Sequence, residues 1–278
     1  MISGYDTGAS FQNLHTHTTY CDGKLSPEEM VKAAIAKGCN SIGFSGHSYV
    51  SFDLDYSMYP DSINDYLDDI ATLKEKYEGT IEIFTGLEQD YFSAEAPEGL
   101  DYIIGAMHYV KRADSHKPVD AGSKDQKEMV GKVFGGDYYA FAEEYFSNLP
   151  DITVKANPDI IGHFDLIAKY NFNGELFDET HPRYVRAALG AMDEILERCR
   201  LFEVNTGAMY RLKKTEPYPS VFLLKELSKR GGEVILSSDS HEAGSICYMF
   251  YEMQELLKAC GFRYLKRLTK QGFIDVPL

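Results

Sequence analysis

Short apolar runs of strand length recur along the chain, separated by segments with helical periodicity. Seven such runs lie at residues 12–15, 41–45, 81–86, 102–106, 159–162, 201–205 and 233–237. Runs of this length bounded by turn residues are typical of strands buried on both faces of a sheet. Because strands and helices mostly alternate, the pattern predicts parallel strands joined by helical crossovers.

The helical segments carry recognisable start signals. Ser26-Pro27-Glu28-Glu29 combines a capping box with a proline at the first helical position, and this helix is predicted to end at Gly38. Further helices are predicted near residues 60–77, 181–199, 220–229 and 243–259. Residues 111–136 are polar and glycine-rich without clear periodicity, so a long loop over the active-site mouth is predicted there.

The number of strands, about seven or eight, favours a (β/α) barrel over an open sheet. A chain of 278 residues with 44% apolar residues can bury one such core, and we expect residues 1–278 to form a single domain. No internal repeat or low-complexity tract suggests another organisation, and the sequence carries no signature of an oligomeric state.

Charge and cysteine content narrow the class of partner and the compartment. With 28 basic and 43 acidic residues the net charge is -15, which disfavours long nucleic acid as a partner. Five cysteines without a CxxC pair indicate a reducing compartment. Because there is neither a signal-peptide pattern nor a run of about 18 apolar residues, we expect a cytoplasmic protein without membrane contact.

Six of the eight histidines stand at or just beyond the end of a predicted strand, and three carboxylates share these positions. These residues are His15, His17, Asp22, His47, Glu88, His108, His163, Asp239 and His241. In a parallel barrel all strands open on one face at their carboxyl ends, so these side chains are expected to converge at one mouth. His15 and His17 are two positions apart on a strand and point the same way, so they can chelate one ion.

A mixed set of imidazole and carboxylate donors suits Zn, Fe or Mn. Nine donors exceed the needs of one ion, so two or three are predicted, with Glu88 able to bridge a pair. Paired metals can activate water and hold the oxygens of a phosphoryl displacement, which matches hydrolysis of a phosphate ester. A single histidine is more often a buried hydrogen-bonded residue than a ligand, and Asp22-Gly23 also suits a turn, but the whole set favours metal binding.

At these residues the sequence resembles the polymerase and histidinol phosphatase (PHP) superfamily, over nearly the whole chain from His15 to His241. The resemblance implies an incomplete or distorted (β/α)7 barrel of the TIM-like type, with its active site at the carboxyl ends of the strands and three metal ions. It implies a first ion held by His15, His17, Glu88 and Asp239, a second held by Glu88, His108 and His163, and a third held by Asp22, His47 and His241. The superfamily often has a histidine where this chain has Asp22, so the third site would have a carboxylate oxygen, a harder ligand, in place of an imidazole nitrogen.

Within the superfamily, Gly105-Ala106-Met107-His108 and Gly162-His163-Phe164-Asp165 are similar to motifs of the stand-alone histidinol-phosphate phosphatases. This resemblance implies hydrolysis of L-histidinol phosphate in histidine biosynthesis, by in-line attack of a metal-held hydroxide without a phosphoenzyme. Asp239 and Glu88 are the candidate catalytic residues, with Asp239 as the proton acceptor.

Arg211 and Lys169 follow predicted strands and are candidates to bind the phosphate of the substrate. A phosphodiesterase or exonuclease of the same superfamily, or a phosphatase acting on a nucleotide or another small phosphomonoester, is the alternative enzyme. A metal-binding module without catalysis is a third possibility, disfavoured because all nine ligand positions are intact.

Overall fold

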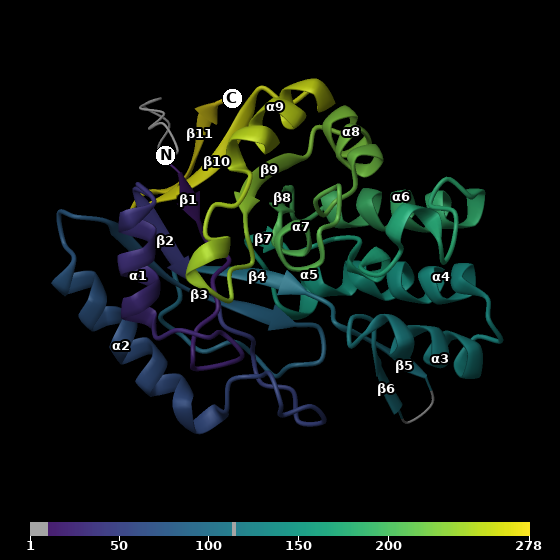
Figure 1. Cartoon of the computed structure of the whole chain (residues 1–278), viewed down its shortest axis with the longest axis horizontal. Helices are drawn as coiled ribbons and strands as arrows, with labels where there is room; N and C mark the ends of the chain where they lie inside the picture. Colours follow the sequence, from purple (N-terminus) through teal and green to yellow (C-terminus); the bar gives the residue numbers. More distant parts are fainter. Residues whose placement is uncertain (1–10, 113–114) are drawn as a thin grey trace.

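A parallel sheet of seven strands, rolled into a nearly closed barrel, forms the centre of the molecule (Figure 1). The computed structural model describes residues 11–112 and 115–278. The strands follow the order β1 (Gln12–Asn13), β2 (Ser41–Phe44), β3 (Glu82–Asp90), β4 (Tyr102–Ala106), β7 (Ile160–Ile161), β8 (Leu201–Asn205) and β9 (Glu233–Ser237). The predicted (β/α)7 barrel is confirmed, with strand positions close to those expected from the apolar runs.

The barrel has one seam, between β1 and β9. Near their carboxyl ends the two strands are joined by an isolated bridge, in which His17 N donates to Ser240 O at 2.8 Å and Ser240 N donates to His15 O at 2.9 Å. At the amino end Gln12 binds the main chain of Leu268 in both directions, at 2.8 and 2.9 Å. Leu268 belongs to a hairpin of β10 (Tyr264–Thr269) and β11 (Gly272–Pro277), so this hairpin contacts β1 at the amino end of the seam.

The barrel interior is filled by large apolar side chains rather than left open. They come from most of the strands and from the hairpin, and comprise Leu14, Phe84, Tyr102, Ile104, Ile160, Leu201, Ile235 and Leu268. The Tyr102 hydroxyl donates to Leu14 O across this core. Gly43 and Gly86 leave room for the Tyr102 ring, because a Cβ atom at either position would overlap it. The interior is thus a packed floor beneath the strand ends.

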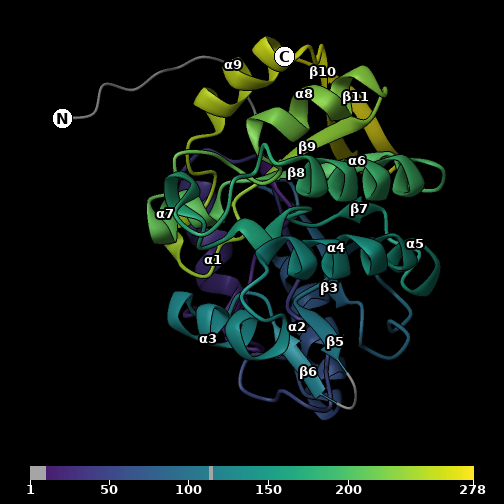
Figure 2. The same cartoon turned by 90° about the vertical axis from the view of Figure 1, so that its right-hand side faces the viewer.

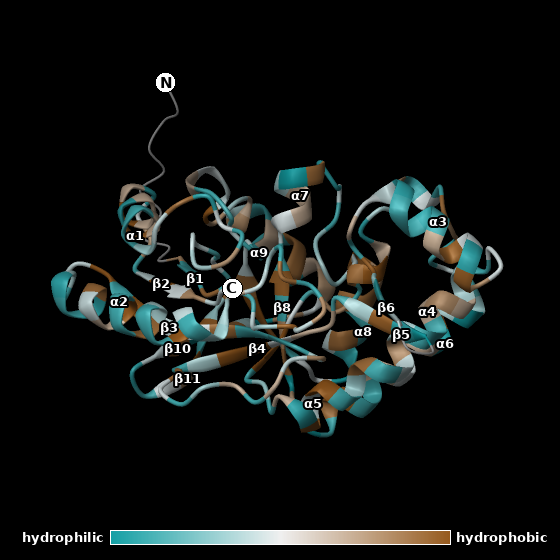
Figure 3. Cartoon of the chain, turned by 90° about the horizontal axis from the view of Figure 1, so that it is seen from below, coloured by the Kyte–Doolittle hydropathy of each residue, from teal (hydrophilic) through white to brown (hydrophobic). Residues whose placement is uncertain are grey.

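Helices cover the outside of the barrel in two groups. On one side α1 (Pro27–Ala36) and α2 (Ile63–Lys76) pack on β2 and β3, and the capping box at Ser26 is present as predicted. On the other side lie α4 (Tyr138–Asn148), α6 (Pro182–Leu196), α8 (Val221–Lys229) and α9 (Phe250–Cys260). Figures 2 and 3 show these helices around the strands, and the colours of Figure 3 show hydrophobic residues on β8 and mostly hydrophilic ones along α2.

Two short helices are α5 (Ile152–Lys155) and α7 (Gly207–Leu212), and single 3-10 turns begin at residues 60, 149, 166, 172 and 243. Within the described ranges no helix has both the length and the apolar character needed to cross a bilayer.

The predicted loop at residues 111–136 is wrong for most of its length. A hairpin of β5 (Tyr109–Arg112) and β6 (Ser115–Pro118) is followed by α3 (Ser123–Val133), while residues 113–114 lie outside the described chain. Only Gln126 and Val130 of α3 are buried, so its apolar stripe is too sparse to produce a helical period. The segment thus forms a hairpin and a helix, and Pro118, Asp120 and Ala121 at their junction line the cavity at the barrel mouth.

The helix predicted at residues 243–259 begins later than expected. A 3-10 turn at Ala243–Ser245 is separated from α9 by Cys247 and Met249, which have φ angles of 54° and 56°. These left-handed conformations interrupt an α-helix. The helices α4 and α7 and the β10–β11 hairpin had no counterpart among the sequence-based elements.

The close fit of Tyr102 over Gly86 makes a testable prediction. Gly86→Ala should destabilise the fold by about 1–3 kcal/mol, because the added methyl group overpacks the barrel interior. Urea denaturation measures this change. Gly131→Ala in α3 is the matched control, because nothing lies within 4 Å of the added atom and alanine favours a helix interior by about 0.5–1 kcal/mol. Equal stability of the two variants would contradict this account of the core.

Candidate metal centre

The nine donors expected at the strand ends converge at the carboxyl end of the barrel. His15 and His17 follow β1, His47 follows β2 and Glu88 lies within β3. His108, His163, Asp239 and His241 follow β4, β7 and β9, and Asp22 lies in the turn before α1. His15 and His17 are completely buried and Glu88 is 1% exposed, so the donors meet in a shielded site rather than on an open surface.

One group of donors surrounds a common point at the base of this site. His15 Nε2 and His17 Nε2 lie 3.2 to 3.8 Å from Glu88 Oε2 and Asp239 Oδ1. Zinc bonds of about 2.0–2.2 Å separate the donors of a tetrahedral site by roughly 3.3–3.6 Å. In the described chain His15 Nε2, His17 Nε2 and Glu88 Oε2 are buried without a hydrogen-bond partner. The donor set therefore fits a divalent metal ion, which would satisfy all three atoms.

Glu88 connects this group to a second one. Its Oε1 atom lies 2.8 Å from His163 Nε2 and 3.4 Å from His108 Nε2, whereas Oε2 faces His15 and His17 and lies 2.8 Å from His47 Nδ1. Burial acts to raise the pKa of Glu88, but His47, His15 and His108 outweigh it and hold that pKa well below its usual value. Glu88 is thus ionised and positioned between two groups of nitrogens.

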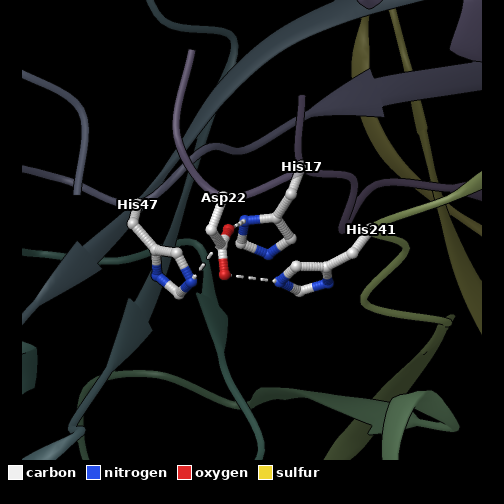
Figure 4. Close-up of side chains that lie close together, drawn as sticks. All are labelled: His17, Asp22, His47 and His241. Carbon is white, nitrogen blue, oxygen red and sulfur yellow. Dashed lines mark hydrogen bonds and ion pairs between the residues drawn. The ribbon is translucent and has the colours of Figure 1, made fainter. Parts of the chain in front are cut away.

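A third group combines Asp22 with His17, His47 and His241 (Figure 4). Asp22 Oδ2 lies 3.1 Å from His241 Nε2, and Oδ1 lies 3.5 Å from His17 Nδ1 and 3.7 Å from His47 Nε2. Burial, together with His241 and His47, lowers the pKa of His17 to about 3. His17 is therefore neutral at pH 7, the state in which imidazole binds a metal ion.

The base of the site also favours positive charge. Burial acts to lower the pKa of His15, but Glu203, Glu88 and Asp239 raise it well above the usual value. Three carboxylates this close to one imidazole favour its protonated form when no other cation is present. A divalent ion would replace those protons and balance the same carboxylates.

Two further carboxylates hold histidine rings from behind and were assigned no role from the sequence. Glu203 Oε2 lies 2.8 Å from His15 Nδ1, and Asp90 Oδ2 lies 3.0 Å from His108 Nδ1. Such contacts fix the ring orientation and direct Nε2 toward a metal ion. A charged residue inside the buried run Leu201–Asn205 is the sequence signal that points to Glu203.

The two candidate phosphate-binding residues also lie at this site. Together with seven of the nine donors, all except His15 and His17, they line a cavity of about 330 Å³. Arg211 donates to Asp239 Oδ2 at 2.8 Å and to Asp239 O at 2.6 Å, and Lys169 Nζ lies 2.8 Å from Asp120 Oδ2. A wider hollow of about 910 Å³ lies at the amino ends of β2, β3 and β4 and contains none of the histidines, so we assign the chemistry to the smaller cavity.

Comparison with known families identifies this arrangement. Residues 13–207, most of the chain, match the PHP domain. The chain belongs to the PHP domain family. The family that the sequence resemblance implied is therefore confirmed, and the nine candidate ligands lie at the strand ends of its barrel.

Two curated relatives span most of the chain. One is named a "Probable histidinol-phosphatase" from Schizosaccharomyces pombe, and it is 26% identical over 92% of this chain and 89% of its own length. The other is a histidinol-phosphatase from Bacillus subtilis, 25% identical over 85% of this chain and 95% of its own length.

A solved structure has the same fold. It is the histidinol phosphate phosphatase of Lactococcus lactis in complex with zinc, L-histidinol and phosphate. The two chains align with a TM-score of 0.70 at 22% identity, covering 95% of this chain and 98% of the other. The barrel described above is therefore an architecture already found in this family.

The contact between Glu203 and His15 predicts an effect on metal affinity. Glu203→Gln should weaken metal binding about 10–100-fold, because an amide nitrogen cannot accept the bonds that the two carboxylate oxygens take from His15, His163 N and Asn205. Titration in metal-buffered solution measures this affinity. Glu197→Gln at the exposed end of α6 is the control and should bind metal normally. Wild-type affinity in Glu203→Gln would show that this contact does not tune the site.

Proposed function

We propose that this chain hydrolyses L-histidinol phosphate to L-histidinol and inorganic phosphate, as a metal-dependent phosphomonoesterase of histidine biosynthesis. The observation that supports this most is the set of nine nitrogen and carboxylate donors at one end of a PHP barrel, beside a cavity that holds two basic side chains. Two relatives that align over 85% and 92% of this chain are named histidinol-phosphatases, which supports the choice of substrate.

We propose the following ligand sets. His15, His17, Glu88 and Asp239 hold one ion, Glu88 with His108 and His163 a second, and Asp22 with His47 and His241 a third. The short distance between His47 and Glu88 also allows His47 to face the second group. Bound divalent ions would supply Lewis acidity and lower the pKa of water, the chemistry that hydrolysis of a phosphate ester needs. Zinc, iron and manganese all suit these donors.

The side chains have separate tasks in this proposal. Arg211 and Lys169 place positive charge on the cavity wall and bind the equatorial oxygens of the phosphate. Asp239 is ionised, because Arg211 and His15 outweigh the effect of burial and hold its pKa well below the usual value. Its carboxylate faces the cavity and accepts the proton of the attacking water. Glu88 is enclosed by histidines and serves as a bridging carboxylate rather than a proton carrier.

Release of inorganic phosphate by the metal-loaded protein tests this function. We expect kcat/KM for L-histidinol phosphate to exceed that for sugar phosphates, nucleoside monophosphates and a generic phosphodiester by more than about a hundredfold, or about 2.7 kcal/mol. His17→Ala should lose bound metal and turnover together, because two of the three donor groups use this residue.

His116→Ala is the matched control, because His116 stacks on Phe52 with ring centroids 3.7 Å apart and belongs to none of the donor groups. A preference for the diester would move the function to a phosphodiesterase, and metal-replete protein that hydrolyses no ester would overturn the enzymatic proposal.

A further inference from the structure

Five carboxylates line the cavity, and four of them have cationic or imidazole partners. Asp22, Glu88 and Asp239 face histidines, and Asp120 pairs with Lys169 at 2.8 Å. Asp53 differs from these four. Its Oδ2 atom accepts a hydrogen bond from the Tyr109 hydroxyl at 2.7 Å, and its Oδ1 accepts a longer one of 3.4 Å from the amide of Asp55. Among the residues that the structure describes, no lysine, arginine or histidine forms an ion pair with Asp53.

The position of Asp53 relates it to the reacting end of the cavity. The ring of Tyr56 lies between Asp53 and the metal-type donors. Its centroid is 4.7 Å from that of His47 and 6.4 Å from that of Tyr109, the hydrogen-bond partner of Asp53. The cationic side chains are attached elsewhere on the wall, since Arg211 is bound to Asp239 and Lys169 to Asp120. The cavity thus has donors for an anion at one part of its wall and an unpaired carboxylate at another.

Asp53 is half-buried in the cavity wall, so a cationic ligand can form a charge-assisted hydrogen bond with its carboxylate without displacing another cation. Phosphate cannot occupy this part of the wall, because both groups are anions. The Tyr109 hydroxyl holds the carboxylate in one orientation, so it is prepared to receive a donor without rearrangement. A protonated amine matches both the charge and the free acceptor sites.

We propose that Asp53 binds the ammonium group of the substrate and thereby restricts the site to phosphate esters of amino alcohols. This inference rests on the proposed function, which supplies the phosphate ester, and adds the residue that selects its organic part. Asp53 is a specificity residue in this scheme, whereas Tyr109 positions it. Tyr109 begins the hairpin whose later residues fall in the segment 111–136 that was predicted to be a loop.

The test compares two substrates that differ only in the amino group. They are L-histidinol phosphate and its des-amino analogue, in which hydrogen replaces the amine. The wild-type enzyme should favour the amine, and the ratio of the two kcat/KM values should fall about tenfold to a hundredfold in Asp53→Asn, because a neutral amide binds an ammonium group less tightly than a carboxylate. Since both rates come from one preparation, this ratio does not depend on the fraction of folded enzyme.

Asp55→Asn is the matched control, two residues away, exposed and outside the cavity lining. It should keep the wild-type ratio. The same ratio in Asp53→Asn as in wild type would overturn the inference, and so would a wild-type enzyme that does not prefer the amine.

A second pair of substrates separates this inference from the proposed function. O-phosphoethanolamine and ethyl phosphate differ in the same way, by hydrogen in place of the amine, and neither carries an imidazole. If the wild type ignored L-histidinol phosphate but preferred O-phosphoethanolamine in an Asp53-dependent manner, the proposed substrate would be wrong and the role of Asp53 would be supported. If substitution of Asp53 left the preference for the amine unchanged in both pairs of substrates, the role of Asp53 would be overturned and the proposed function would stand.

Discussion

The carboxylate of Glu88 lies within 3.6 Å of nitrogen atoms from five histidines, and the rest of the active end depends on this contact. A buried carboxylate is strongly unfavourable unless it is paired with opposite charge and its lone pairs are satisfied. The five rings come from the ends of β1, β2, β4 and β7, so the pairing requires those strands to be side by side around β3. The closed order of the sheet provides this arrangement, and the packed floor around Tyr102 and Ile104 holds the strand ends at fixed spacing.

The seam of the barrel affects the site directly. Asp239 and His241 follow β9, and His15 and His17 follow β1, so the two strands at the seam supply four of the nine donors. A short main-chain bridge between residues 15–17 and 240 joins them there, and the Asn13 side chain accepts a further hydrogen bond from Ser238 N at 2.9 Å. Asp239 itself has a φ angle of 46°, an unfavourable conformation for a residue with a side chain. The bonds from Arg211 to both its carboxylate and its main-chain oxygen stabilise that conformation.

The sequence predicted the barrel and the convergence of the donors because both follow from periodicity and strand-end position. It could not predict the segments whose structure depends on tertiary contacts. The helix α3 buries too few apolar residues to show a period, and α9 is shortened by left-handed residues that have no glycine signal. Glu203 and Asp53 were missed for opposite reasons. Glu203 is a charged residue within the buried run Leu201–Asn205, but its role becomes visible only when the structure places it beside His15. Asp53 lies in an irregular segment where an acidic residue is ordinary surface composition.

The overall charge of -15 repels a phosphate ester, whereas the basic side chains of the cavity would attract it. Under the proposed function, the balance between this repulsion and this attraction would favour a small substrate. Repulsion from surface carboxylates is screened over about 8–10 Å at physiological salt, whereas Arg211 and Lys169 line the cavity in which the proposed function places the phosphate. A single phosphate group that enters a space of about 330 Å³ leaves most of the repulsion outside and meets the local positive charge. A polyanion would keep its remaining phosphates over the acidic surface and gain only one favourable contact. Under the proposed function, this balance would favour a compact monoester over a polyanion before any contact with the organic group is made.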